Sequence, residues 1–165
     1  MRKVCVAMVM TVLLFFCFLI GCVAGLRSMT APAVVCWGAH LGWLHFAGTS
    51  LGFIDHKATL AIFTLLALGE LVADKLPQIP ARTALPSLIA RIISGGFSGG
   101  ALAVGAGSGF VAGALVGVFG AVFATYAGYH MRHALVTQVR LPDFAMAILE
   151  DLMTIAGGFY VVSRF

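Results

Sequence analysis

The sequence predicts an all-α membrane protein, a polytopic membrane helix bundle with about five transmembrane helices plus one interfacial or re-entrant helix. Hydrophobic residues make up 61% of the chain and charged residues only 10%, whereas a soluble domain carries about 25% charged residues. The apolar residues are grouped in runs long enough to cross a hydrocarbon core of about 30 Å. The length of 165 residues fits a single transmembrane domain, residues 1–165.

The basic residues favour lipid contact over nucleic-acid binding. The formal net charge is +4, and the ten Lys and Arg residues lie near the ends of the apolar runs. At these places they set membrane topology and contact anionic headgroups. Basic and aromatic residues are not interleaved in a way that suits nucleic acid. We therefore expect membrane lipids as partners, and no nucleic acid.

The first span is expected over residues 4–26. The basic start at residues 1–3 also resembles a signal peptide, and residues 19–22 fit a lipoprotein cleavage box. The apolar run is longer than the ~7–15 residues of a signal h-region. As a helix it reaches ~34 Å, enough to cross the membrane. A retained transmembrane helix is therefore favoured.

The next segment, residues 31–46, is expected to form an interfacial or re-entrant helix. Thr30 can cap its N-terminus, and Pro32 falls in the first turn, where a missing N–H costs nothing. Trp37 and Trp43 favour the membrane interface. A full sixth span remains the alternative for this uncharged segment.

Four more spans are expected, over residues 58–76, 88–106, 109–131 and 143–163. Proline-rich sequence around Arg82 separates the first two, and Gly105–Gly109 suits the tight turn between the next two. Asp74 and Lys75 are expected at an interface. Asp143 is expected to cap the N-terminus of the last helix.

The distribution of Lys and Arg predicts the orientation. With five spans and a cytoplasmic N-terminus, seven of the ten basic residues lie inside, as the positive-inside rule prefers. With a sixth span, an outside N-terminus becomes the better solution, with six basic residues inside. The margin favours five spans, an N-terminus in the cytoplasm and a C-terminus outside.

Short matching strings raise the question of an internal repeat. Ala24–Arg27 closes the first span and Ala127–His130 the fourth, and the span after each contains an acidic residue. In the five-span topology the first and fourth spans run antiparallel, as in the inverted repeats of transporters. Chance similarity between short apolar strings is the alternative, and both remain open.

A row of glycines predicts close helix packing. Gly105, Gly109, Gly113 and Gly117 recur every four residues, and small residues at this spacing lie on one helix face. Packing within the chain is favoured over a homo-oligomer that forms through this glycine face. Both alternatives remain open.

Intramembrane charges are the candidate functional residues. A carboxylate at the bilayer centre costs roughly 2.5–3.5 kcal/mol, so such residues pair, face the interior or serve a function. Arg27 is the natural counter-charge, with an interfacial anchor as the alternative. The candidate polar pathway therefore comprises Glu70, Glu150, Asp151, Arg27 and Thr154.

The sharpest expectation concerns Glu70 and Glu150. Their matched places in the two proposed repeats predict one shared interior site, with a proton held between them or with Arg27 nearby. The alternative gives each acid a different backbone or hydroxyl partner. Glu150 and Asp151 point about 100° apart and cannot both line one narrow seam, whereas Thr154 shares the Glu150 face.

Three function classes follow, in order of preference. The first is a small transporter or channel that is proton- or cation-linked, with an unknown substrate. The second is a structural or accessory membrane protein whose acids only hold helices together. The third, a membrane-embedded enzyme acting on lipid, lacks a catalytic motif. We therefore expect no enzyme activity, no cofactor and no metal site.

Several blocks of the sequence resemble a known family. They are Gly25–Pro32, Glu70–Pro77, Ala90–Gly95 and Leu141–Phe144 with the Glu150-Asp151 pair. Together they are similar to the small bacterial multi-pass membrane proteins classified as domain-of-unknown-function family number 4126. The resemblance covers nearly the whole chain from residue 20. It implies a location in the bacterial inner (cytoplasmic) membrane, and it does not imply any particular activity.

Overall fold

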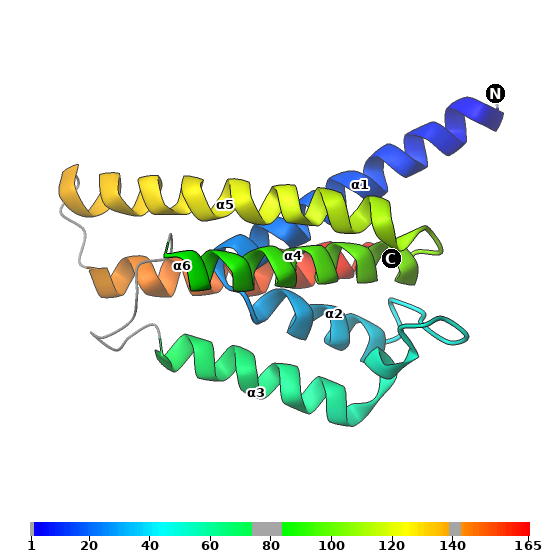
Figure 1. Ribbon diagram of the computed structural model, residues 1–165, viewed down its shortest axis with the longest axis horizontal. Helices are drawn as coiled ribbons and strands as arrows, with labels where there is room; N and C mark the ends of the chain where they lie inside the picture. Colours follow the sequence, from blue (N-terminus) through cyan, green and yellow to red (C-terminus); the bar gives the residue numbers. More distant parts are fainter. Residues whose placement is uncertain (1, 74–83, 139–142) are drawn as a thin grey trace.

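The computed structural model describes residues 2–73, 84–138 and 143–165, with side chains at 7–73, 84–132, 134–135 and 146–165. All regular structure in these residues is helical, which confirms the all-α prediction (Figure 1). The elements are α1 (Arg2–Leu26), α2 (Thr30–His40), the 3-10 helix η1 (Gly52–Asp55), α3 (Lys57–Ala73), α4 (Leu85–Gly105), α5 (Phe110–Gln138) and α6 (Asp143–Val162).

Three helices are long and apolar enough to cross a membrane. These candidate spans are Ala7–Leu26 in α1, Leu85–Gly105 in α4 and Phe110–Arg132 in α5. The other two expected spans correspond to α3, with 17 described residues, and α6, with 20. The structure thus supports a membrane protein without confirming five spans. Asp74, Lys75 and Arg82 lie outside the described residues, as does the Asp143 side chain.

The turn between α4 and α5 lies where the sequence predicts it. Gly107 has a φ of +75°, a conformation that glycine adopts without steric cost. The N–H of Ser108 donates to the carbonyl of Ala103 at 2.8 Å, and the N–H of Gly107 donates to Val104. These bonds satisfy carbonyls at the end of α4 and reverse the chain.

Helix α2 is shorter and more deeply buried than expected. It ends at His40 instead of residue 46, and residues 30–36 are all buried. It packs against α1, α3, α4 and α6. A helix lying on the membrane surface would keep one face exposed, so the interfacial arrangement is not observed. Its 11 residues span only about 17 Å, less than the hydrocarbon core of about 30 Å.

Consecutive α-helices alternate in direction, so both termini lie at the same end of the bundle (Figure 1). In α1 and α5, Gly21 packs on Gly117 and Leu26 packs on Gly128, so these two helices run parallel. The predicted inverted repeat required them to run antiparallel and is therefore wrong in this form.

Small residues permit very close contact among α1, α4 and α5. A Cβ atom on Gly99 would overlap the Gly113 backbone, and one on Gly21 would overlap Gly117. Gly113 and Gly117 thus face other helices of the same chain. Gly105 instead ends α4 and Gly109 precedes α5, so the four glycines do not form one helix face. The turn between α4 and α5 interrupts the predicted row.

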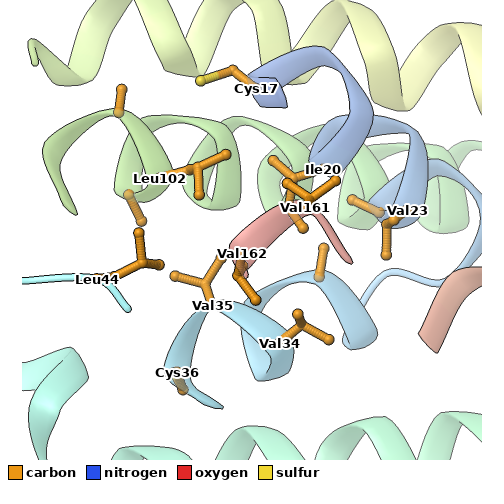
Figure 2. Close-up of a cluster of buried hydrophobic side chains, with 14 of the residues drawn as sticks. Cys17, Ile20, Val23, Val34, Val35, Cys36, Leu44, Leu102, Val161 and Val162 are labelled. Carbon is orange, nitrogen blue, oxygen red and sulfur yellow. The ribbon is translucent and has the colours of Figure 1, made fainter. Parts of the chain in front are cut away.

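Apolar side chains fill the interior on the side of the termini. Figure 2 shows Ile20 from α1, Val35 from α2, Leu102 from α4 and Val162 from α6 meeting in one cluster. Each of these four side chains is almost fully buried. We call this the apolar cluster. It leaves polar groups to the other end of the bundle, where α1 ends and α2 begins.

Candidate functional site

The candidate site is built around the break between α1 and α2. Residues 27–29 separate the two helices, so the carbonyls that end α1 lack partners within that helix. Arg91 of α4 donates through Nη1 to the carbonyls of Gly25 and Leu26, the latter at 2.8 Å. Thr125 of α5 donates to Gly25 at 3.1 Å. Groups from distant helices thus satisfy the end of α1.

Arg27 lies inside this break and joins two further helices. Its side chain is 1% exposed, and it forms an ion pair through Nη2 with Asp151 of α6, whose side chain is 13% exposed. Nη1 also donates to the backbone carbonyl of Glu70 in α3 at 3.4 Å. The ion pair is the arrangement expected for a counter-charge and not for a headgroup anchor.

The Glu70 carboxylate holds the start of α2. Oε1 accepts from the Ser28 N–H at 2.8 Å and from the Ser28 hydroxyl at 2.7 Å, and Oε2 accepts from the Met29 N–H at 2.8 Å. Thr30 was expected to cap α2, but it is the first residue of the helix, and its buried hydroxyl makes no hydrogen bond to the described residues. A carboxylate from α3 takes that role, with its negative charge at the positive end of the helix dipole.

Glu150 uses a different partner. Its side chain is 3% exposed, and Oε2 lies 3.4 Å from Nη1 of Arg132 in α5. The Thr154 hydroxyl donates to the carbonyls of Glu150 and Asp151, both at 2.9 Å. Thr154 therefore stabilises the backbone beneath the two acids. The adjacent acids point to different helices, as their 100° separation predicts.

The structure brings together four of the five predicted residues but not in the predicted pairing. Arg27 contacts Asp151 and the backbone of Glu70, and Thr154 lies beneath Asp151. Among the described contacts, no hydrogen bond joins the carboxylates of Glu70 and Glu150, each of which has its own partners. The shared proton between them is therefore not observed.

Ser28, which binds Glu70, and four further polar residues of the network were missed by the sequence analysis. Arg91, Ser94 and Thr125 bind backbone carbonyls of the break, Ser94 through the carbonyl of Ser28, and Arg132 pairs with Glu150. Arg91 and Arg132 had been counted as loop charges. Arg91 lies inside the continuous helix α4 and not in a loop. Its place within a predicted span could have identified it as an intramembrane cation.

We call the interactions of Arg27, Glu70, Arg91, Asp151 and their partners the polar network. Buried charges of this kind inside a helix bundle are rare and are a common feature of functional sites in membrane proteins. The pocket of about 510 Å³ is not lined by these residues, whereas the pocket of about 410 Å³ is lined by Met29 and Ser94, which bind Glu70 and the carbonyl of Ser28.

No protein-family model, no curated protein and no solved structure matches this chain. Assignment of the chain therefore depends on its fold and polar network. The similarity to domain-of-unknown-function family 4126 stays a prediction.

Proposed function

We propose that this chain is a small proton- or cation-linked membrane transport protein, and that the Arg27–Asp151 ion pair is its coupling site. The observation that carries the proposal is the burial of this pair at a helix break inside an apolar bundle. Charges within a membrane bundle are costly and mark ion or proton pathways more often than they serve packing alone.

The broken α1–α2 segment supports this class of function. In many transporters, discontinuous helices present half-helix N-termini to anionic groups and serve as binding sites. Here α2 is such a half-helix, and the carboxylate at its N-terminus is Glu70 of the same chain. Protonation of Glu70 would remove the negative charge that α2 attracts. Glu70 is thus the group through which we expect a proton to open the network.

The proposal includes a topology that differs from the five-span expectation. An even number of crossings puts both termini on one side. Counted over all ten basic residues, four lie there and six on the other side, and the six include Arg27, Arg91 and Arg132 of the bundle interior. The positive-inside rule then favours termini outside the cytoplasm. We propose that α3 and α6 also cross the membrane, and that this is the bacterial inner membrane implied by the family resemblance.

A structural role is the rival function, and one observation favours it. The described acids of the network all have partners, and the apolar cluster closes the interior toward the other end of the bundle. Transport would require this cluster to open. If the acids only hold helices together, their substitution should lower the stability of the protein. The native protein should then show no ion or proton flux.

Proton flux into liposomes separates the two functions. Purified protein is reconstituted with a pH-sensitive dye inside the vesicles, and valinomycin with potassium provides charge compensation. We expect acid-driven proton uptake above that of empty vesicles, and its loss in Asp151→Asn and Glu70→Gln. The matched control is Asp55→Asn, because Asp55 is exposed in η1, remote from the network.

The outcomes assign the function. Flux in the native chain and in Asp55→Asn, but not in the two network variants, supports transport if all four proteins stay monodisperse. No flux above empty vesicles in any protein, under either direction of the gradient and with sodium or potassium present, overturns the proposal and favours the structural role.

A further inference from the structure

A second site lies at the opposite end of the bundle from the polar network. A pocket of about 510 Å³ is enclosed by the N-terminal half of α1, the residues after α2, the end of α4 and the C-terminal residues. In Figure 1 this half of α1 extends away from the other helices, on the side of both termini. The pocket is large enough for part of a small amphiphile.

The two sides of this pocket differ in chemistry. One wall is apolar and formed by α1, where Met8, Val9 and Val12 are largely exposed. The other side carries Arg164 and His45. No Asp or Glu side chain is among the described residues that line the pocket. A cation therefore lies beside an apolar surface, and none of the described side chains in the lining is acidic.

The cationic side has a defined geometry. The Arg164 guanidinium carbon lies 4.3 Å from the centre of the Tyr160 ring, a cation–π contact that restrains a surface side chain. Trp43 also lines the pocket, and tryptophan favours the level of lipid headgroups. These groups place the polar side of the pocket at the depth where a lipid phosphate lies.

We propose that this pocket binds one anionic phospholipid. Its acyl chain packs along the α1 wall, and its phosphate accepts hydrogen bonds from Arg164 and His45. Charge complementarity decides between phospholipids, because basic pockets between transmembrane helices bind anionic headgroups. The proposal does not depend on the transport function, because the pocket contains no residue of the polar network.

The two tryptophans of the chain provide a direct test. Trp43 lines the pocket, whereas Trp37 donates to Thr64 in the contact between α2 and α3. In Trp37→Phe, fluorescence reports on Trp43 alone. This protein is titrated with brominated phosphatidylglycerol or brominated phosphatidylcholine in vesicles of unbrominated phosphatidylcholine. Bromine quenches tryptophan on contact, so quenching measures lipid occupancy at Trp43.

We expect the relative binding constant of phosphatidylglycerol to exceed that of phosphatidylcholine by about fivefold, the value for one basic residue. Arg164→Gln should abolish this preference. Lys57→Gln removes the same charge from an exposed residue at the start of α3, outside the pocket. This control should keep the preference. In Trp43→Phe the fluorescence comes from Trp37 alone, outside the pocket, and the two brominated lipids should quench it equally.

Three results would overturn the proposal. The first is equal quenching of Trp43 by the two lipids. The second is an equal loss of preference in Arg164→Gln and Lys57→Gln, which would indicate general attraction to the positive surface. The third is an equal preference at Trp37, which would show enrichment around the whole protein.

Discussion

At Arg27, burial and pairing have opposite effects on stability. Burial of a guanidinium and a carboxylate costs several kcal/mol for each ion, and their attraction repays this only with good geometry and further hydrogen bonds. Arg27 has the Asp151 carboxylate and the Glu70 carbonyl as partners. Removal of one partner therefore costs more than removal of both, because the remaining charge stays buried.

This asymmetry gives a prediction for a double-mutant cycle. We expect Arg27→Gln and Asp151→Asn each to lower the free energy of unfolding by about 3–5 kcal/mol. The double variant should lose much less than the sum of the two. Denaturation in mixed detergent micelles, followed by circular dichroism, measures all four corners of the cycle. Additive losses would show that the pair is not coupled in the folded protein.

The charged residues of the site could be predicted because charge stands out in an apolar sequence. Arg27, Glu70 and Asp151 were recognised in this way, and so was the role of Arg27 as a counter-charge. The partners Ser28, Ser94 and Thr125 were not recognised. Their roles depend on carbonyls and N–H groups of a turn that is distant along the chain, and a lone Ser or Thr in an apolar run carries no such signal.

At the scale of the helix, the contact between α4 and α5 depends on the absence of side chains. Gly95 and Gly99 of α4 face Gly117 and Gly113 of α5, and added Cβ atoms would meet backbone atoms at each position. Helices in lipid associate through such close packing, because burial of apolar surface provides little gain there. Bulk at these positions must separate the backbones.

We therefore expect Gly113→Leu to destabilise the bundle and Ala112→Leu to leave it nearly unchanged. Gly113 is buried at the contact and Ala112 is exposed, so equal bulk has different effects. The cost should be about 1–3 kcal/mol for the first and within about 0.5 kcal/mol for the second. The melting temperature in detergent compares the two. Equal shifts of the melting temperature in the two variants would contradict the packing role of Gly113.

Helix α3 is attached to the bundle by few contacts. Among its described residues, Ala67 alone is buried, and the helix packs mainly on α2 and η1. Two sets of side-chain hydrogen bonds hold it to α2 and the residues just before α2. The Glu70 carboxylate accepts from the N–H groups of Ser28 and Met29, and the indole N–H of Trp37 donates to the Thr64 hydroxyl. Glu70 therefore fixes the position of α3 as well as the start of α2.

Loss of the Glu70 charge is expected to loosen α3. Spin labels at Ile62→Cys in α3 and Ile93→Cys in α4, both exposed positions, are introduced in a background without the four native cysteines. In Glu70→Gln the distance distribution between the labels should broaden, because hydrogen bonds to a charged group are roughly twice as strong as neutral ones. Asp55→Asn should keep the native distribution. Identical distributions in the two variants would contradict this anchoring role.

At the scale of the whole molecule, composition predicted the all-α fold. The apolar runs predicted where the helices lie, but α2 ends six residues before the predicted bound and α5 ends seven residues after it. The direction of the helices was not predictable in the same way. The count of crossings depended on residues 31–46, where an uncharged segment suits a surface helix, a half-helix or a span equally well. The burial of α2 and its contacts with four helices argue against the surface helix, and contacts of this kind leave no periodic pattern in so apolar a sequence.

The alternating directions predict which residues share a side of the membrane. The start of α3 and the C-terminus lie at one end of the bundle, and the end of α5 lies at the other (Figure 1). We therefore expect Lys57 and Arg164 on one side of the membrane and Arg132 on the other. Single cysteines at these three positions, in the cysteine-free background, are treated in intact cells with a membrane-impermeant thiol reagent. We expect labelling at 57 and 164 but not at 132.

Positions 57, 132 and 164 do not distinguish the two topologies, because both place Lys57 and Arg164 outside and Arg132 inside. The two topologies differ in the side on which the N-terminus lies. With five spans the N-terminus and the C-terminus lie on opposite sides of the membrane, and with six crossings they lie on the same side. A further cysteine at Lys3 therefore distinguishes them. Labelling at positions 3, 57 and 164 together supports the even number of crossings. Labelling at 57 and 164 but not at 3 would show that α2 does not return the chain across the membrane, and would restore the five-span topology with its cytoplasmic N-terminus.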